Sequence, residues 1–487
     1  MAKKQTNVAL VTIAIFVATF MTAIEGTIVS TAMPTIVGSL HGVHLMNWIF
    51  SIYLLTNAMA TPIYGKLADR IGRKPVFILG LIIFVLGSLL SGLSQSMEML
   101  ILFRAIQGIG AGAIMPVTFT IIADIYPLEK RAKVLGFNGS AWGIASVVAP
   151  LLGGFIVDQL SWHWIFIINV PIGLITLLLV VFFLHEDVTT VREPMDYLGT
   201  LWLLLALLSM MYGFQTLAGT NGLITFIGLM LVSALMLWLF VRQEKKAQDP
   251  IIDLELFKNR PFVVHNLIAA LIAGFVIGFE VYMPMWMQGI LGLEASLGGF
   301  AVTPSSLMWI VGSFVAGRLL VNYRPQRLLY VALGVLLIGS LVLALVPEST
   351  PYWFFLIVAG GLGFGFGITI TTTTVTAQAV VAKDQVGVAT SFNTLSRTLG
   401  QTLMVSIYGI VLNMRLAQGV RDNADITTGM LNKLINPHTA SQLPAKLLPT
   451  LHQILYEGLH NIYFFSVVIV VLAIVVNWFD KTKLHQD

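Results

Sequence analysis

Long apolar stretches recur along nearly the whole chain, and they restrict its fold more than any other feature. A helix that spans a membrane needs about 20 largely apolar residues. Fourteen stretches of that kind lie near residues 8–37, 47–66, 75–95, 98–122, 134–157, 163–184, 197–218, 222–241, 262–287, 298–317, 328–346, 352–378, 391–413 and 461–479. Because a segment in lipid must satisfy its own backbone polar groups, these stretches predict an all-α integral membrane protein with fourteen transmembrane helices.

The composition also indicates lipid as the main solvent. Of the 487 residues, 57% are hydrophobic and only 10% are charged, whereas a soluble domain carries roughly 25% charged residues. The net charge of +4 does not indicate a nucleic-acid partner, because the basic residues lie between apolar stretches rather than on one soluble surface. The chain has no cysteine, which excludes disulfides and thiolate metal sites. We expect neither a metal nor a cofactor.

The N-terminus resembles a signal peptide at first sight, since Lys3 and Lys4 precede an apolar run. That run continues far beyond the usual length, and Glu25 and Pro34 interrupt it without a small-residue cleavage site. We therefore expect a retained first helix.

The distribution of lysine and arginine predicts the orientation in the membrane. With the N-terminus in the cytoplasm, 21 of the 27 basic residues fall on the inner side, and the six short outer loops contain none. Two more, Arg104 and Arg397, lie within predicted helices, and four lie in a long outer segment, 414–460. This segment is either a partly ordered extracellular loop or a cap over the substrate path, with a short amphipathic helix around 450–460. We expect a multi-pass protein of the bacterial cell membrane with both termini in the cytoplasm.

Four ionisable residues lie inside the apolar stretches, namely Glu25, Arg104, Glu280 and Arg397. Such a residue costs about 2.5–3.5 kcal/mol at the bilayer centre, so it usually faces a cavity or a partner. Burial favours a neutral Glu25, whereas a nearby guanidinium favours the ionised form, and a carboxyl between these two influences can carry a proton. Arg104 is the candidate partner. The alternative is an ion pair that only holds helices together.

The ninth stretch holds the other candidate substrate residues. Glu280, Tyr282 and Trp286 lie close together in it, and with Glu25 they form the predicted substrate site. Glu280 either binds a cationic substrate or a second proton, or lies in water at the outer interface. Arg397 shares a helix face with polar residues four positions before and after it, which indicates a structural, gating or transport role.

The loop after the second stretch, residues 65–74, reads GKLADRIGRK. It resembles the signature loop of the major facilitator superfamily, G-x-L-A-D-R-x-G-R-K, at every fixed position. The resemblance implies alternating access, with a charge relay of Asp69, Arg73 and Asp124 that stabilises the outward-facing state. The residues assigned to gating are Gly65, Asp69, Arg70, Gly72, Arg73 and Asp124.

Three further motifs are similar to those of the fourteen-helix drug:proton antiporters (EmrB/QacA-like). The residues around Arg104, LFRAIQG, resemble a motif linked to proton coupling, and Glu25 stands where the first-helix motif D-x-T-I-V usually has aspartate. The fifth stretch resembles the antiporter motif, although Ala149 replaces the usual glycine before the proline. The matching residues of that motif are Gly139, Gly143, Pro150, Gly153 and Gly154.

The family arrangement implies two six-helix bundles, residues 1–184 and 262–487, with an inserted helix pair at 185–261. We expect a proton-coupled multidrug efflux antiporter that exports amphipathic or cationic small molecules and works as a monomer. The alternative is a dedicated exporter of one metabolite, antibiotic, bile acid or lipid on the same fold. An enzyme is not expected, because no H-E-x-x-H, G-x-S-x-G or P-loop motif is present.

Overall fold

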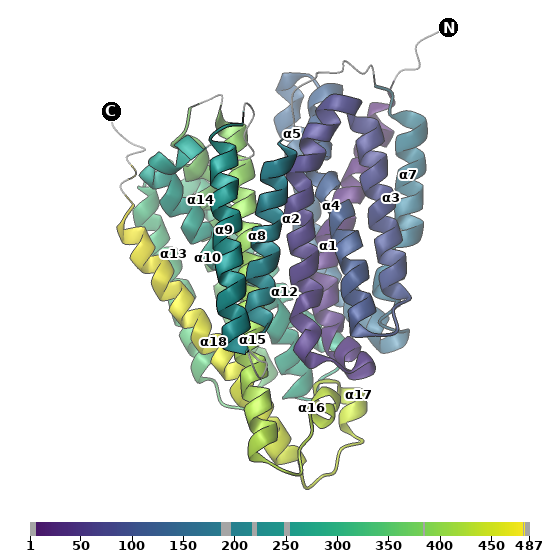
Figure 1. Cartoon of the computed structure of the whole chain (residues 1–487), viewed down its shortest axis with the longest axis vertical. Helices are drawn as coiled ribbons and strands as arrows, with labels where there is room; N and C mark the ends of the chain where they lie inside the picture. Colours follow the sequence, from purple (N-terminus) through teal and green to yellow (C-terminus); the bar gives the residue numbers. More distant parts are fainter. Residues whose placement is uncertain are drawn as a thin grey trace.

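The computed structural model describes residues 6–186, 196–216, 222–247, 254–382, 385–480 and 482. Within these ranges the chain is helical and contains no strand, so the predicted all-α fold is confirmed. The long helices run side by side along the longest axis of the molecule, and both termini lie at the same end (Figure 1). The first part of the chain comprises η1 (Val43–Leu45) and the helices α1 (Val8–Leu40), α2 (Met46–Ile71), α3 (Arg73–Gly92), α4 (Met97–Ile125), α5 (Leu128–Gln159), α6 (Trp164–Ile167) and α7 (Asn169–Phe183).

The rest of the chain continues the same pattern. A separate pair follows, α8 (Tyr197–Thr216) and α9 (Gly222–Glu244). The last part comprises η2 (Leu254–Lys258) and the helices α10 (Arg260–Gly289), α11 (Ala295–Phe300), α12 (Thr303–Leu319), α13 (Pro325–Leu345), α14 (Tyr352–Ala379), α15 (Val386–Asp422), α16 (Thr428–Ile435), α17 (Pro437–Ala440) and α18 (Leu448–Trp478).

Side chains just before three of the long helices explain where these helices begin. Asn7, Ser96 and Asn259 each accept a hydrogen bond from a backbone N–H in the first turn of α1, α4 and α10. These N–H groups have no acceptor within their own helix, so such caps set the helix start. Gly72 ends α2 at φ 98°, a conformation that favours glycine, and α3 begins immediately after it.

Among the described residues, eleven helices are long and apolar enough to cross a membrane, or twelve if α5, bent by 41°, is one span. Helices also form at the expected positions of α2 and α8, but these two do not meet the same criterion. Polar residues such as Asn47 and Ser51 lower the apolar content of α2. Both are buried against other helices rather than exposed. The count of fourteen spans therefore stays a prediction.

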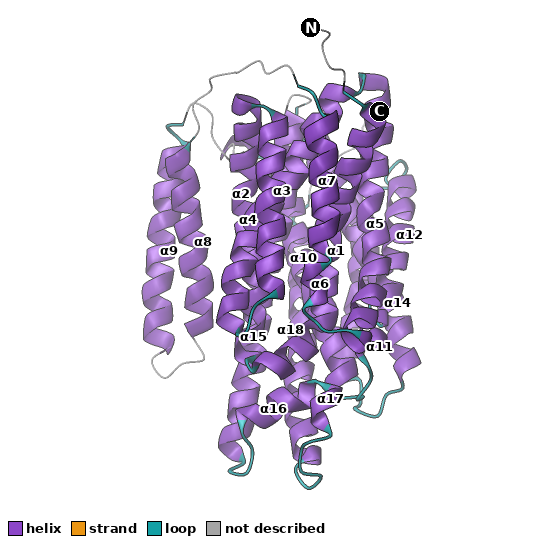
Figure 2. Cartoon of the chain, turned by 90° about the vertical axis from the view of Figure 1, so that its right-hand side faces the viewer, coloured by secondary structure: helices purple, strands orange, loops and turns teal. Residues whose placement is uncertain are grey.

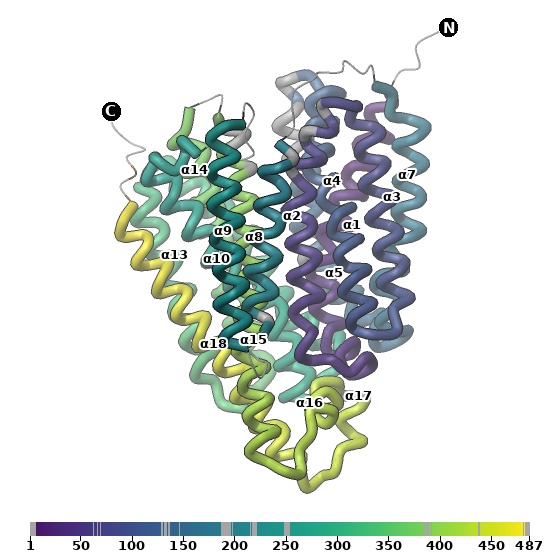
Figure 3. Tube along the Cα trace, in the orientation of Figure 1, coloured from purple at the N-terminus to yellow at the C-terminus, as the bar shows by residue number. Residues whose placement is uncertain are grey.

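Helices α1–α7 form one side of the molecule in Figure 1, and α10, α13, α14, α15 and α18 form the other. The tube in Figure 3 traces the same division by chain position. The pair α8–α9 stands apart in Figure 2 and packs through Leu203 and Leu207 against Leu55 of α2 and Leu399 of α15. The segments 187–195 and 248–253 lie outside the described residues, so the domain limits at 184 and 262 stay predictions.

The segment 414–460 is more helical than expected. Helix α15 continues to Asp422, and residues 450–460 belong to α18 rather than to a separate short helix. Between them, α16 and the residue after it dock on η1 and on the end of α1, since Asn432 accepts a hydrogen bond from Val43 N at 3.3 Å and Asn436 lies against Gly38. The prediction of a separate helix at 450–460 is therefore wrong, because the apolar face of this segment continues into the last long helix.

Candidate functional site

The two predicted proton-coupling residues form an ion pair in the interior. Arg104 of α4 donates a hydrogen bond to Glu25 of α1, and the two side chains are 1% and 0% exposed. The same guanidinium donates to Gln107 at 2.7 Å and to the Ile49 carbonyl at 3.4 Å. It also lies 4.1 Å from the ring centroid of Tyr53, close enough for a cation–π contact. Glu25 and Arg104 therefore neutralise each other's charge in a part of the interior that solvent does not reach.

The second carboxylate oxygen of Glu25 has its own partner. Asn169, at the start of α7, donates a hydrogen bond to it at 2.8 Å. Asn169 also lies 3.0 Å from the hydroxyl of Ser88, which in turn donates to the Phe166 carbonyl at 2.9 Å. Because both oxygens are bonded and the charge is balanced, the site can hold an ionised carboxyl in an apolar interior. A proton that binds Glu25 would remove that balance.

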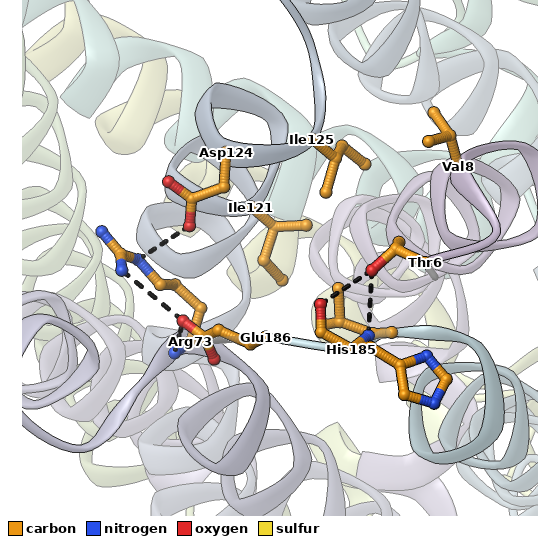
Figure 4. A pocket seen from close by; sticks show the side chains of 9 residues that line it. Thr6, Val8, Arg73, Ile121, Asp124, Ile125, His185 and Glu186 are labelled. Carbon is orange, nitrogen blue, oxygen red and sulfur yellow. Dashed lines mark hydrogen bonds and ion pairs between the residues drawn. The ribbon is translucent and has the colours of Figure 1, made fainter. Parts of the chain in front are cut away.

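Part of the charge relay predicted for the signature loop is formed in the structure. Arg73 Nε lies 3.1 Å from Asp124 Oδ2, and its Nη1 lies 3.5 Å from Glu186 Oε1 (Figure 4). These three residues line a pocket of about 470 Å³ at the end of the molecule that carries the termini. The side chain of Asp69 lies outside the described residues, and Arg70 is partly buried. The structure thus brings together two of the three relay residues and adds Glu186.

Glu186 also joins the end of α7 to the start of α3. Its carboxylate accepts hydrogen bonds from the backbone N–H groups of Arg73 at 2.9 Å and Lys74 at 3.0 Å. In return, Lys74 Nζ donates to the carbonyls of Val181 and Leu184 at the end of α7. Each helix therefore supplies the charge that satisfies the free backbone groups of the other.

Glu186→Ala is expected to lower the stability of the folded protein by about 0.5–2 kcal/mol, the usual effect of losing a helix cap. Thermal unfolding of the purified protein in detergent measures the change. Glu255→Ala is the matched control, because Glu255 is 77% exposed and its ion pair with Lys258 contributes little. Equal stability of both variants would contradict the capping role.

The sequence matches the Major Facilitator Superfamily over residues 15–197 and 197–405, which is most of the chain. The chain belongs to the major facilitator superfamily. It is thus a multi-pass membrane transporter of small molecules and not an enzyme.

Two curated relatives of this transporter come from Bacillus subtilis (strain 168). Multidrug resistance protein 3 is 32% identical over 489 residues, covering 97% of this chain and 95% of the relative. Multidrug transporter protein MdtP is 33% identical over 517 residues, covering 98% of this chain and 94% of the relative. Among solved structures, a bacterial homologue of the human lysosomal transporter Spinster has a TM-score of 0.70 at 18% identity, covering 96% of each chain. That likeness supports the fold alone.

The glycines of the predicted antiporter motif have different surroundings in this transporter. Among the described residues, none lies within 4 Å of a Cβ added to Gly139, and one added to Gly143 would make only an ordinary contact with Ile310, at 3.4 Å. In contrast, a Cβ added to Gly153 would lie 2.7 Å from Ile28 of α1, and one added to Gly154 would lie 2.2 Å from the Cα of Ser296. Only the last part of the motif therefore requires glycine for close helix packing.

The predicted substrate residues are not gathered into one site. Tyr282 donates a hydrogen bond to Asn47 of α2, and Trp286 packs in an aromatic cluster with Phe355 and Tyr456, at ring distances of 5.8 and 5.4 Å. Both side chains are fully buried. Glu280 is only partly buried, and within the described part of the chain it has no hydrogen bond or ion pair. Of these three residues, only Glu280 keeps part of its surface exposed in this structure.

Arg397 lies near a buried polar chain in the last part of the transporter. Asn393, one turn before it, donates to Asn266 of α10 at 3.0 Å and accepts from Thr374 of α14 at 2.9 Å. Arg397 itself is partly buried, and its Nε has no acceptor among the described residues. The structure thus assigns a packing role to Asn393.

Hydrogen bonds between the first and last parts of the transporter gather toward the end away from the termini, where α1 ends and α2 begins (Figure 1). They join Asn47 to Tyr282, Thr31 to Gln288 at 3.1 Å, Ser51 to Ser406 at 3.2 Å, Val43 to Asn432 at 3.3 Å, and Asp158 to the start of α11. This end of the interface is closed by direct polar contacts.

The sequence analysis assigned no role to four of the residues that make these contacts, namely Asn169, Ser88, Glu186 and Asp158. A polar residue two positions before Pro171 in an apolar stretch was the available signal for Asn169. Glu186 and Asp158 stand near helix ends, where an acidic residue is ordinary and indicates no particular role.

Proposed function

We propose that this transporter is a proton-coupled multidrug efflux antiporter that exports amphipathic or cationic small molecules by alternating access. The printed names of both Bacillus relatives support the multidrug assignment. The observation that carries the proton coupling is the fully buried pair of Glu25 and Arg104. An acid held in this way can alternate between a paired, ionised state and a neutral state. A dedicated exporter of one metabolite, antibiotic, bile acid or lipid is the second candidate.

Alternating access is supported by the position of the polar contacts between the two parts. With the termini in the cytoplasm, as the basic residues predict, the end held together by these polar contacts faces outward. In the proposed cycle, a proton from outside neutralises Glu25 and weakens its tie to Arg104. Loss of that proton inside restores the pair.

The energetics of the exchange depend on charge. A membrane potential of 100 mV is worth about 2.3 kcal/mol for each charge moved, and one pH unit about 1.36 kcal/mol. One monocation leaving against one entering proton moves no net charge. Such an exchange is driven by the pH gradient alone, so its rate should not respond to a change in potential at constant pH gradient.

An efflux screen in a drug-sensitive bacterial host tests the proposal directly. Cells that express the chain should accumulate less of several structurally unrelated dyes, and a protonophore should abolish the difference. Export of only one compound would favour the dedicated exporter. Efflux that persists without a proton gradient would reject proton coupling.

Glu280→Gln is expected to reduce transport of monocationic dyes about tenfold and to leave neutral substrates unaffected. The physical reason is that Glu280 is an acid in a membrane helix with no partner among the described residues, so a cation gains by approaching it. A tenfold change corresponds to about 1.4 kcal/mol.

Initial rates for paired cationic and neutral dyes in the same vesicles measure this selectivity. Glu280→Asp is the matched control, because it keeps the charge and should keep most cation transport. Equal loss for both dye classes would show that Glu280 acts in packing rather than in cation recognition.

A further inference from the structure

One face of α5 meets the short helix α11 across the interface between the two parts of the transporter. Pro150, Gly154 and Asp158 follow one another at four-residue spacing, so they lie on the same face of α5. A Cβ on Gly154 would lie 2.2 Å from the Cα of Ser296, and one on Gly299 would lie 2.6 Å from the Pro150 carbonyl oxygen. The two backbones are therefore in direct contact, and no side chain fits between them.

Asp158 completes this face with a pair of hydrogen bonds. Its Oδ1 accepts from the backbone N–H of Ala295 at 3.2 Å, and its Oδ2 accepts from that of Ser296 at 3.0 Å. These N–H groups belong to the first turn of α11 and have no acceptor in their own helix. The negative charge of Asp158 also faces the positive end of that turn. Both carboxylate oxygens thus serve one contact between the two parts.

The contact lies at the closed end of the interface. Helix α5 belongs to the first part and α11 to the last, so the two must separate there when the transporter opens away from the termini. On opening, the carboxylate and the two N–H groups would meet water, which replaces their hydrogen bonds. The contact can therefore break and form again in each cycle.

We propose that Asp158 is the latch that keeps this end closed while cargo enters from the other side. Gly154 and Gly299 bring the helices close enough for the latch to form. The inference rests on the alternating access of the proposed function and adds a positioning residue to it. Asp158 acts on the equilibrium between the two open states and does not touch substrate.

The absence of cysteine makes the latch accessible to a distance measurement. Leu160→Cys, after α5, and Leu297→Cys, on α11, place two spin labels at positions that are 62% and 41% exposed. Double electron–electron resonance spectroscopy in lipid nanodiscs then measures the distance between the two spin labels, and hence the separation of the two helices. Asp158→Ala removes both acceptors, and we expect the ratio of long to short distances to rise about tenfold.

Two further Asp158 variants and one charge control keep the test decisive. Asp158→Asn keeps the shape of the side chain, so it should disturb the packing less than Asp158→Ala, and it should give a smaller shift in the same direction. Asp158→Glu should restore the short distance, which a purely structural loss would not predict. Asp425→Asn is the charge control, because Asp425 is an exposed acid at the same end of the molecule.

The outcomes separate the latch from the proposed function. A distance shift in Asp158→Ala or Asp158→Asn supports the latch, even if no proton-dependent efflux is found. An unchanged distance distribution in both variants overturns the latch, whatever the efflux. Gly154→Val supplies an independent check, since its side chain would collide with Ser296 and should shift the distances in the same direction.

Discussion

Glu25→Gln is expected to abolish proton-driven efflux, with a loss of at least about 100-fold in the initial rate. Glutamine has nearly the same shape, but it cannot bind and release a proton, so the variant should still exchange substrate down its own gradient. In vesicles, drug efflux and proton flux measured together distinguish these two activities. Undiminished proton-coupled efflux would remove Glu25 from the mechanism.

Two variants serve as controls for this prediction. Glu98→Gln makes the same chemical change at an exposed position on α4 and should leave transport unaltered. Glu25→Asp keeps a carboxyl, and the related antiporters usually have aspartate in this motif, so it should retain part of the activity. If Glu25→Asp were as inactive as Glu25→Gln, geometry rather than proton exchange would explain the loss.

Arg104→Met is expected to lower the stability of the fold by about 3–5 kcal/mol. This substitution leaves the carboxylate of Glu25 buried without its counter-charge, which is the usual cost of breaking one side of a buried ion pair. Methionine fills much of the same volume but cannot donate to Glu25, Gln107 or the Ile49 carbonyl. Thermal unfolding of the purified variants measures the effect.

The double variant Glu25→Gln with Arg104→Met separates the structural role of the pair from its transport role. Because no buried charge remains, it should recover much of the stability lost by Arg104→Met alone, and a double-mutant cycle gives the coupling energy. It should nevertheless remain inactive in proton-driven efflux. A stable and active double variant would mean that the pair only holds helices together.

The apolar stretches determined the secondary structure almost completely. Each stretch forms a helix, because in lipid the backbone has no other way to satisfy its polar groups. The sequence also identified Glu25 and Arg104, since a charge in lipid is expensive enough to require a partner. Gly72 was named only through the signature loop, and the structure adds the reason for a glycine there, a positive φ that favours a residue without a side chain.

Partners at long range were not predictable in the same way. Asn169 and Ser88 bond near Glu25 from helices more than sixty residues away in the chain, and a neutral polar residue in a helix carries no comparable cost. Tyr282 and Trp286 were expected to line a substrate site, but packing between helices buries both. Composition does not specify the rotation of a helix about its own axis when it is apolar on all sides.

The sequence by itself determined that this chain is a helical membrane protein and which charges in it need partners, because the lipid solvent penalises every unpaired polar group. Only the tertiary structure decided which helices touch and at which end the two parts are closed. The contact of Asp158 with α11 depends on backbones that approach within van der Waals distance at Gly154. Such an approach is set by the packing of the whole bundle, and no local pattern contains it.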